Sequence, residues 1–180
     1  MSEHYPQLAT HFPGNSEARR NRSGSDALSA FEREFVHAIH CQQIFPVFQP
    51  IVDSHHRLQG MVILSRWRRD GTVLPPGAFL PQIHAEYAWQ VLTAFVLQEA
   101  VQKINQYPGE FYFSLNIPDA LASHEFLQRM LNAAKQQLDP PQRTDRLVLE
   151  FAETLAFSQQ GKTADNINTL KQLGFRIMLD

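Results

Sequence analysis

Strand-like and helix-like segments alternate along most of this 180-residue chain, a pattern that few folds accommodate. Segments rich in β-branched and aromatic residues predict strands, and apolar residues at helical spacing predict helices. The expected strands are 44–53, 59–67, 111–117, 146–152 and 175–180, and the expected helices are 26–41, 79–106, 123–138 and 163–173. Alternation of this kind implies right-handed βαβ units around a parallel sheet, so we predict an α/β fold.

The start of the folded region departs from this parallel pattern. The strands 44–53 and 59–67 are separated by a short turn, which predicts an antiparallel hairpin. Pro46 and Pro50 remove two backbone donors on one side, which favours an edge or antiparallel position for the first strand. The helix 26–41 before it is amphipathic, with Ser25 or Asp26 as its expected cap.

Composition narrows the class of protein. With 16 Lys+Arg against 18 Asp+Glu and 43% apolar residues, the chain is typical of an ordinary globular protein and shows no charge bias toward nucleic acid or membrane. A single cysteine forms no internal disulfide, and no targeting segment is visible, so we expect a cytoplasmic protein. We predict a flexible polar tail over 1–25, a helix and linker over 26–43, and one domain over 44–180.

Four polar residues stand at the carboxyl ends of otherwise apolar strands: Arg66, Asn116, Glu150 and Asp180. Active sites of α/β barrels and open sheets are built at that end of the strands. An amide and two carboxylates from neighbouring strands would suit a hard cation such as Mg²⁺ or Mn²⁺. Each residue could instead merely mark a strand entering its loop, and four in register favour a functional site.

A second group of metal-ligand types lies in the first helix. His37, His40 and Cys41 have the spacing i, i+3 and i+4, so they share one helical face and could bind Zn²⁺. No fourth ligand is evident, and histidines at a helix end are common. We therefore favour a structural interpretation of this group.

Several short motifs, in order and spacing, resemble the EAL domain family of bacterial cyclic di-GMP phosphodiesterases across 44–180. They are FQPIVD (48–53), Arg66-Trp67, PPGAFLP (75–81), SLNIP (114–118), LEFAET (149–154) and MLD (178–180). The resemblance implies a TIM-like (β/α) barrel with an antiparallel first strand. Because such a barrel needs about 250 residues, this chain would hold an incomplete one, with only its first five strands.

The resemblance also implies roles for individual residues. Gln49 and Arg66 match family positions that contact cyclic di-GMP. Asn116, Glu150 and Asp180 match metal-ligand positions, here vestigial, and Glu153 matches a residue that anchors a loop. No cofactor is required by this interpretation, although Mg²⁺ or Mn²⁺ would accompany any surviving nucleotide site.

The departures from the family pattern argue against catalysis. The motif that names the family falls at Val62-Ile63-Leu64, so a valine replaces the glutamate that is a metal ligand in relatives. Pro118 and His84 replace the usual serine and glutamate at two further positions. The rest of the double-aspartate motif, a lysine and a later catalytic glutamate would all follow Asp180.

Four functions remain open at this point. A degenerate, non-catalytic module that binds a protein partner such as a transcription regulator is our first expectation. The alternatives are a cyclic di-GMP receptor without turnover, an active phosphodiesterase restored by oligomerisation, and the remnant of an interrupted gene. We also expect self-association, because no helix follows the last strand, and we expect no direct binding to nucleic acid or membrane.

Overall fold

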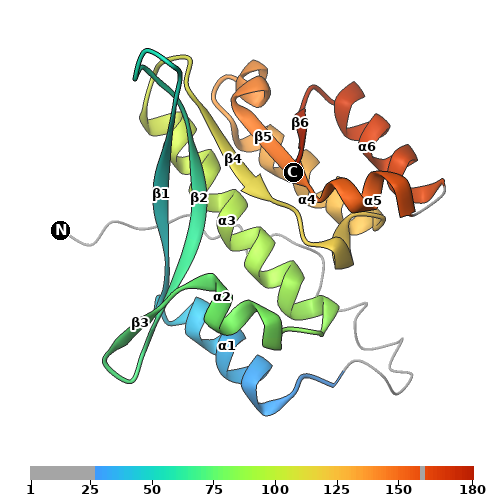
Figure 1. Cartoon of the computed structure of the whole chain (residues 1–180). Coiled ribbons are helices and arrows are strands. Elements are labelled where there is room, and N and C mark those ends of the chain that lie inside the picture. The colour runs from blue at the N-terminus through green and yellow to red at the C-terminus, as the bar shows by residue number, and fades with distance from the viewer. Residues whose placement is uncertain (1–26, 159–160) are drawn as a thin grey trace.

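A computed structural model describes residues 27–158 and 161–180 of the chain (Figure 1). The helices are α1 (Ala30–His40), α2 (Pro76–Phe79), α3 (Glu86–Gln106), α4 (Glu125–Gln137), α5 (Glu153–Ser158) and α6 (Lys162–Gln172). The strands are β1 (Ile44–Val52), β2 (Leu58–Arg69), β3 (Thr72–Leu74), β4 (Tyr112–Asn116), β5 (Leu147–Phe151) and β6 (Arg176–Leu179). Short 3₁₀ helices are η2 (Leu80–Gln82), η3 (Asp119–Leu121) and η4 (Pro141–Arg146).

All the described strands belong to one sheet, in the order β1-β2-β4-β5-β6, with β3 paired to β2. The first strand runs antiparallel to β2, whereas β2, β4, β5 and β6 are mutually parallel. This arrangement confirms the predicted α/β class, the antiparallel first strand and its edge position, and it corresponds to a TIM-like barrel that is incomplete.

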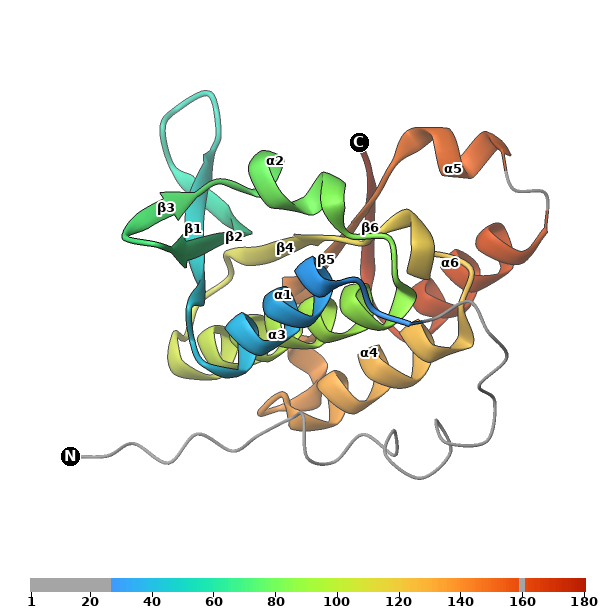
Figure 2. The ribbon, with the colours of Figure 1, turned by 90° about the horizontal axis from the view of Figure 1, so that it is seen from below.

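The core lies between the sheet and a layer of helices. In Figure 2, α1, α3 and α4 lie together on one side of the sheet. The buried side chains of β2 and β4 on that side are apolar, among them Ile63, Trp67 and Phe113. Trp67 packs edge-on against Phe35 of α1 and Phe79 of α2, at centroid distances of 5.7 Å. Aromatic packing therefore fixes α1 and α2 against the end of β2.

The strand boundaries agree with the expected ones to within two residues, whereas two of the expected helices differ more from the structure. The amphipathic helix begins at Ala30 and is capped by Ser29 instead of Ser25 or Asp26, which lie outside the described residues. Instead of one helix over 79–106, the chain forms α2, η2 and then α3 from Glu86. Pro81 interrupts the expected helix because it cannot donate to the helical ladder.

Gly174 follows α6 and has φ of +96°, the left-handed conformation that the sequence predicts there. The short elements β3 and α5 were not predicted. The expected tail over 1–25 lies outside the described residues. Among the described residues, no helix is both long enough and apolar enough to cross a membrane.

Candidate functional site

The strand register places one side chain from each of five strands in a single row. Gln49 pairs with Val62, Val62 with Ser114, Ser114 with Val148, and Val148 with Arg176. Because side chains alternate across a strand, this row and the residues two positions along share one face. We call this the inner face, since it lies opposite the face that α1, α3 and α4 cover.

Asn116 and Glu150 lie side by side at the carboxyl ends of β4 and β5 on the inner face. They are direct register partners, so their Cα atoms are about 4.8 Å apart. The N–H of Ile117 donates to the carbonyl of Glu150 at 2.8 Å, which continues the ladder just past both residues. Asn116 is exposed and Glu150 half-buried, so both present their oxygens at this end of the sheet.

Asp180 follows β6 and lies close to the end of β5. Its N–H donates to the carbonyl of Phe151 at 2.9 Å, and its own carbonyl accepts from the N–H of Glu153 at 2.7 Å. The predicted loop-anchoring residue Glu153 thus holds Asp180 through its backbone, at the start of α5. Since Met178 is the register partner of Glu150, Asp180 stands two residues beyond the Asn116–Glu150 level.

The two predicted ligand-contacting residues lie on the inner face but are well separated. Gln49 is opposite Val62, and Arg66 is opposite Phe45, four residues further along β2. At about 3.3 Å per residue, roughly 13 Å of strand separates the two levels. Arg66 is half-buried, and one of its guanidinium nitrogens donates to the carbonyl of Ser65 at 3.1 Å. Among the described residues, the Arg66 guanidinium makes no other hydrogen bond.

Val62 lies in this row between Gln49 of β1 and Ser114 of β4. A carboxylate at this position would lie on the same face as Asn116 and Glu150, two residues before their level in the register. A valine has no lone pair for a cation. The adjacent Ser114 is fully buried, and its hydroxyl makes no hydrogen bond to the described residues.

The opposite end of the inner face is closed by a stack of side chains. An ideal Cβ on Gly60 would lie 2.7 Å from the ring of Tyr112, so the ring rests directly on the glycine backbone. The guanidinium of Arg176 lies over the same ring at 4.9 Å from its centroid. This stack, from β2, β4 and β6, separates the candidate site from the amino-terminal end of the strands.

The possible zinc group is not assembled. Cys41 Sγ lies 3.3 Å from His37 Nε2, but His40 Nδ1 lies 2.7 Å from the carbonyl of Val36 on its own helix. In the part of the chain that the structure describes, no three His, Cys, Asp or Glu side chains are grouped to hold a metal.

The structure contains two polar clusters, around Glu32 and Asp53, that the sequence analysis did not predict. Glu32 is 4% exposed, and its carboxylate accepts from the N–H groups of Ser29, His84 and Ala85. Burial raises the pKa of Glu32, but these hydrogen bonds outweigh it and lower the pKa to about 2. Serine followed three residues later by glutamate is a capping-box pattern, so Ser29 and Glu32 could have been found from the sequence.

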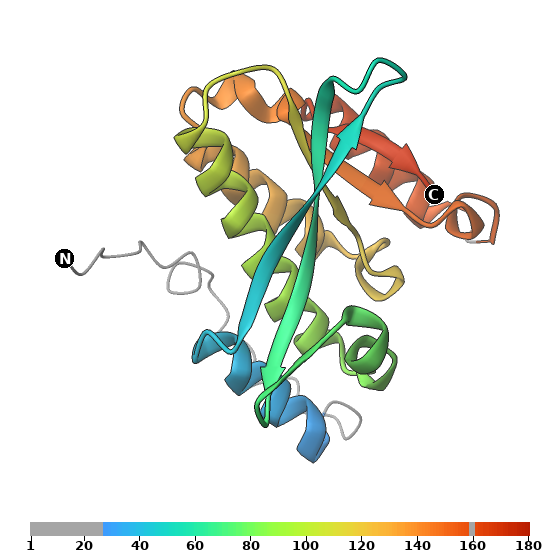
Figure 3. The same ribbon diagram turned by 60° about the vertical axis from the view of Figure 1, so that its left-hand side comes forward.

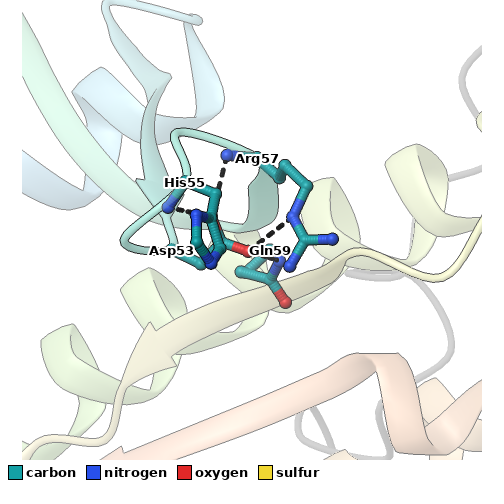
Figure 4. Close-up of polar contacts among 4 residues, drawn as sticks. All are labelled: Asp53, His55, Arg57 and Gln59. Carbon is teal, nitrogen blue, oxygen red and sulfur yellow. Dashed lines mark hydrogen bonds and ion pairs between the residues drawn. The ribbon is translucent and has the colours of Figure 1, made fainter.

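The second cluster organises the turn between β1 and β2 (Figure 4). Asp53 Oδ1 accepts from the N–H groups of His55 and Arg57, and Oδ2 accepts from the side chains of Arg57 and Gln59. The hydrogen bond from the Arg57 N–H is the main reason that the pKa of Asp53 is lowered. This turn lies at the far end of β2 from Arg66 and is structural.

A cavity of about 480 Å³ is distant from the predicted site. It lies between the start of β4 and η4 and is lined by Gly109, Glu110, Gln142, Arg143, Asp145 and Arg146. None of these residues is at the carboxyl end of a strand. The cavity therefore adds nothing to the Asn116–Glu150 site.

Comparisons with known proteins agree with this geometry. The model of the EAL domain family matches residues 32–180. Two proteins of Escherichia coli K12 are similar to the chain: the probable cyclic di-GMP phosphodiesterase PdeA (30% identity over 66% of this chain) and the probable cyclic di-GMP phosphodiesterase PdeN (28% over 89%). The chain spans 16% of the first relative and 30% of the second.

Solved structures resemble the fold. An EAL domain protein from Listeria monocytogenes superposes with a TM-score of 0.69 at 25% identity, covering 86% of this chain and 61% of that one. The EAL enzyme Bd1971, solved with cAMP and cyclic di-GMP bound, gives a TM-score of 0.71 at 19% identity, covering 83% of this chain and 43% of that one.

Proposed function

The chain belongs to the EAL domain family, and from this membership we propose that it is a degenerate cyclic di-GMP signalling module that acts without hydrolysing the nucleotide. Its output, in this proposal, is the binding of a protein partner such as a transcription regulator. The observation that carries the proposal is Val62, an apolar residue on the inner face at the position where the family resemblance implies a metal-binding carboxylate.

The chemistry of the site supports loss of turnover. Hydrolysis of a phosphodiester by two metal ions requires both ions about 3.5–4 Å apart with an activated water between them. Asn116 and Glu150 are adjacent and Asp180 is close to them, so these three residues suit one hard cation. If Mg²⁺ or Mn²⁺ binds, they would hold it, and the ion would neutralise phosphate charge.

Exposed apolar side chains support a role in protein binding. Val52 and Leu58, which flank the β1–β2 turn, are 49% and 42% exposed, and Met178 and Leu179 of β6 are also exposed. Surface groups of this kind mark interaction sites when they cluster. The β1–β2 turn itself is fixed by the Asp53 hydrogen bonds, so it presents Val52 and Leu58 on a defined support.

A cyclic di-GMP receptor is the second candidate function. Arg66 favours it, because a half-buried guanidinium with free donors suits phosphate. Similar folds have been solved with this nucleotide, including Bd1971, and the E. coli relatives are described as probable phosphodiesterases of it. An active, metal-dependent phosphodiesterase is the third candidate and is weakened by Val62.

Calorimetric titration of cyclic di-GMP into the folded chain with Mn²⁺ present, followed by an assay for linear dinucleotide, separates the three. We expect no linear product. Binding that Arg66→Ala abolishes and Arg129→Ala leaves intact would identify a receptor, since Arg129 is exposed on α4, away from the site. Absence of binding would leave the protein-partner function, and accumulation of linear product would overturn the proposal.

A further inference from the structure

The cavity beside η4 lies at the opposite end of the strands from the Asn116–Glu150 site. At the upper left of Figure 3, the link from α3 to β4 lies beside the orange segment that holds η4, and the cavity is between the two. Both segments lead into the amino-terminal ends of strands, β4 and β5. We call this space the η4 cavity. Its volume of about 480 Å³ is typical of sites for small molecules.

Two guanidinium groups that line the η4 cavity are close neighbours. Nη1 of Arg143 and Nη1 of Arg146 donate to the same acceptor, the carbonyl of Ile104, at 3.4 and 3.3 Å. Arg146 also donates to the carbonyls of Tyr107 and Phe111, which fix it at the end of α3. Within residues 27–158 and 161–180, the Arg143 guanidinium makes no other hydrogen bond, so most of its donors remain for a ligand.

The positive charge of this pair is not neutralised. Glu110 and Asp145 line the same cavity, yet in the described part of the chain neither forms an ion pair with Arg143 or Arg146. Nη2 of Arg146 is buried without a hydrogen-bond partner among the described residues. Burial lowers the pKa of Arg146, and the neighbouring Arg143 lowers it further, because both disfavour the cation. An anion beside the two arginines would offset this cost.

We propose that the η4 cavity binds a small zwitterionic phosphate ester, with its phosphate beside Arg143 and Arg146 and its ammonium group beside Glu110 and Asp145. A phosphate dianion suits two adjacent guanidiniums, since each offers paired donors to the phosphate oxygens. The charges of the two arginines and the two acids cancel, so a simple anion is attracted by one pair and repelled by the other. A ligand that carries both charges is attracted by all four side chains.

The remaining lining narrows the class of ligand. Gln142 supplies an amide that can both donate and accept, and Gly109 contributes only backbone. None of the described residues that line the cavity has an apolar side chain. A hydrophilic ligand such as an amino-sugar phosphate therefore fits better than an acyl chain or a stacked base. This inference does not depend on the proposed function, because the cavity is at the other end of the strands.

Two matched probes test the recognition of both charges. Glucosamine 6-phosphate and glucose 6-phosphate share the phosphate and the sugar ring, and they differ in one ammonium group that replaces a hydroxyl. In calorimetric titrations of the 180-residue chain, we expect both probes to bind. Glucosamine 6-phosphate should bind about threefold more tightly, because its ammonium group gains solvent-exposed ion pairs with the carboxylates.

Variants assign the two charges to their residues. Arg143→Gln should weaken the binding of both probes about tenfold, because a charged donor to the phosphate is lost. Glu110→Gln combined with Asp145→Asn should remove the preference for glucosamine 6-phosphate and should strengthen the binding of glucose 6-phosphate. Arg129→Gln, the same charge change at an exposed position of α4, is the control and should alter neither affinity.

Failure of both probes to bind at millimolar concentration would overturn the proposal, and so would equal losses of affinity from Arg143→Gln and Arg129→Gln. A preference for glucosamine 6-phosphate that survives removal of both carboxylates would show that the ammonium group is not recognised in this cavity, which overturns the proposed class of ligand. Urea unfolding of each variant confirms that a variant without binding is folded.

Discussion

The carboxylate of Glu32 in α1 accepts a 2.7 Å hydrogen bond from the backbone N–H of Ala85, the residue just before α3. The same oxygen accepts from His84, and the other oxygen accepts from Ser29 at the start of α1. One buried carboxylate thereby joins two helices that are more than 50 residues apart in sequence. It caps α1 and also satisfies the backbone where the chain enters α3.

The first prediction concerns the pH dependence of stability. The pKa of Glu32 is lowered from 4.5 to about 2 in the folded chain, so its contribution is complete above the unfolded value and is lost as the pH falls toward 2. Between about pH 5 and 2, the wild type should lose about 2–3 kcal/mol more unfolding free energy than Glu32→Gln. Urea unfolding at several pH values measures this, with the exposed Glu110→Gln as control.

The second prediction concerns the close approach of Tyr112 to Gly60. Gly60→Ala should reduce the unfolding free energy by about 1–3 kcal/mol, because its Cβ would meet the ring at 2.7 Å and force the stack with Arg176 apart. Gly77→Ala is the matched control, since nothing lies within 4 Å of the added methyl group. Equal stability of the two variants in denaturant unfolding would contradict the close contact.

The third prediction concerns Arg146, a buried guanidinium at the carboxyl end of α3. It donates to the carbonyls of Ile104, Tyr107 and Phe111. Arg146→Met should reduce the unfolding free energy by about 2–3 kcal/mol, because three carbonyls lose the hydrogen bonds that this buried guanidinium donates. Arg129→Met, on an exposed position of α4, should change it by less than about 0.5 kcal/mol.

The fourth prediction tests the meaning of Val62. Val62→Glu should strengthen Mn²⁺ binding, because the new carboxylate would lie on the inner face with Asn116 and Glu150. It should still produce no linear dinucleotide, since one added ligand does not create a two-ion site. Calorimetry with Mn²⁺ and a product assay make both measurements, with Val62→Leu as control. Hydrolysis by Val62→Glu would show that a single residue prevents catalysis.

Much of the fold was predictable because the signals are local. The β-branched and aromatic residues around Val62, Ser114 and Val148 predicted their strands to within two residues, and the order of strand and helix predicted the parallel sheet. The interruption at Leu80–Gln82 was missed: the residues that keep the helical period, from Trp89 to Ile104, all lie within α3, and the expected helix was drawn beyond them to residue 79. Elements as short as β3 and α5 have too few residues to show a period.

The candidate site was predictable in part for the same reason. The positions of Asn116, Glu150 and Asp180 at strand ends follow from the pattern, and their adjacency follows from parallel pairing. The roles of Gln49, Arg66 and Glu153 came from family resemblance and stay predictions. The separation of Gln49 from Arg66 by four residues of β2 required the register, which no local pattern supplies.

The sequence by itself determined which segments are strands and most of the helices, and that Val62 shares a strand face with Arg66. These properties depend on the alternation and size of neighbouring side chains. Only the tertiary structure decided that Glu32 joins α1 to α3 and that Tyr112 rests on Gly60. Such contacts depend on pairs of residues far apart in the chain, and packing brings them together only when the sheet and its helices are assembled.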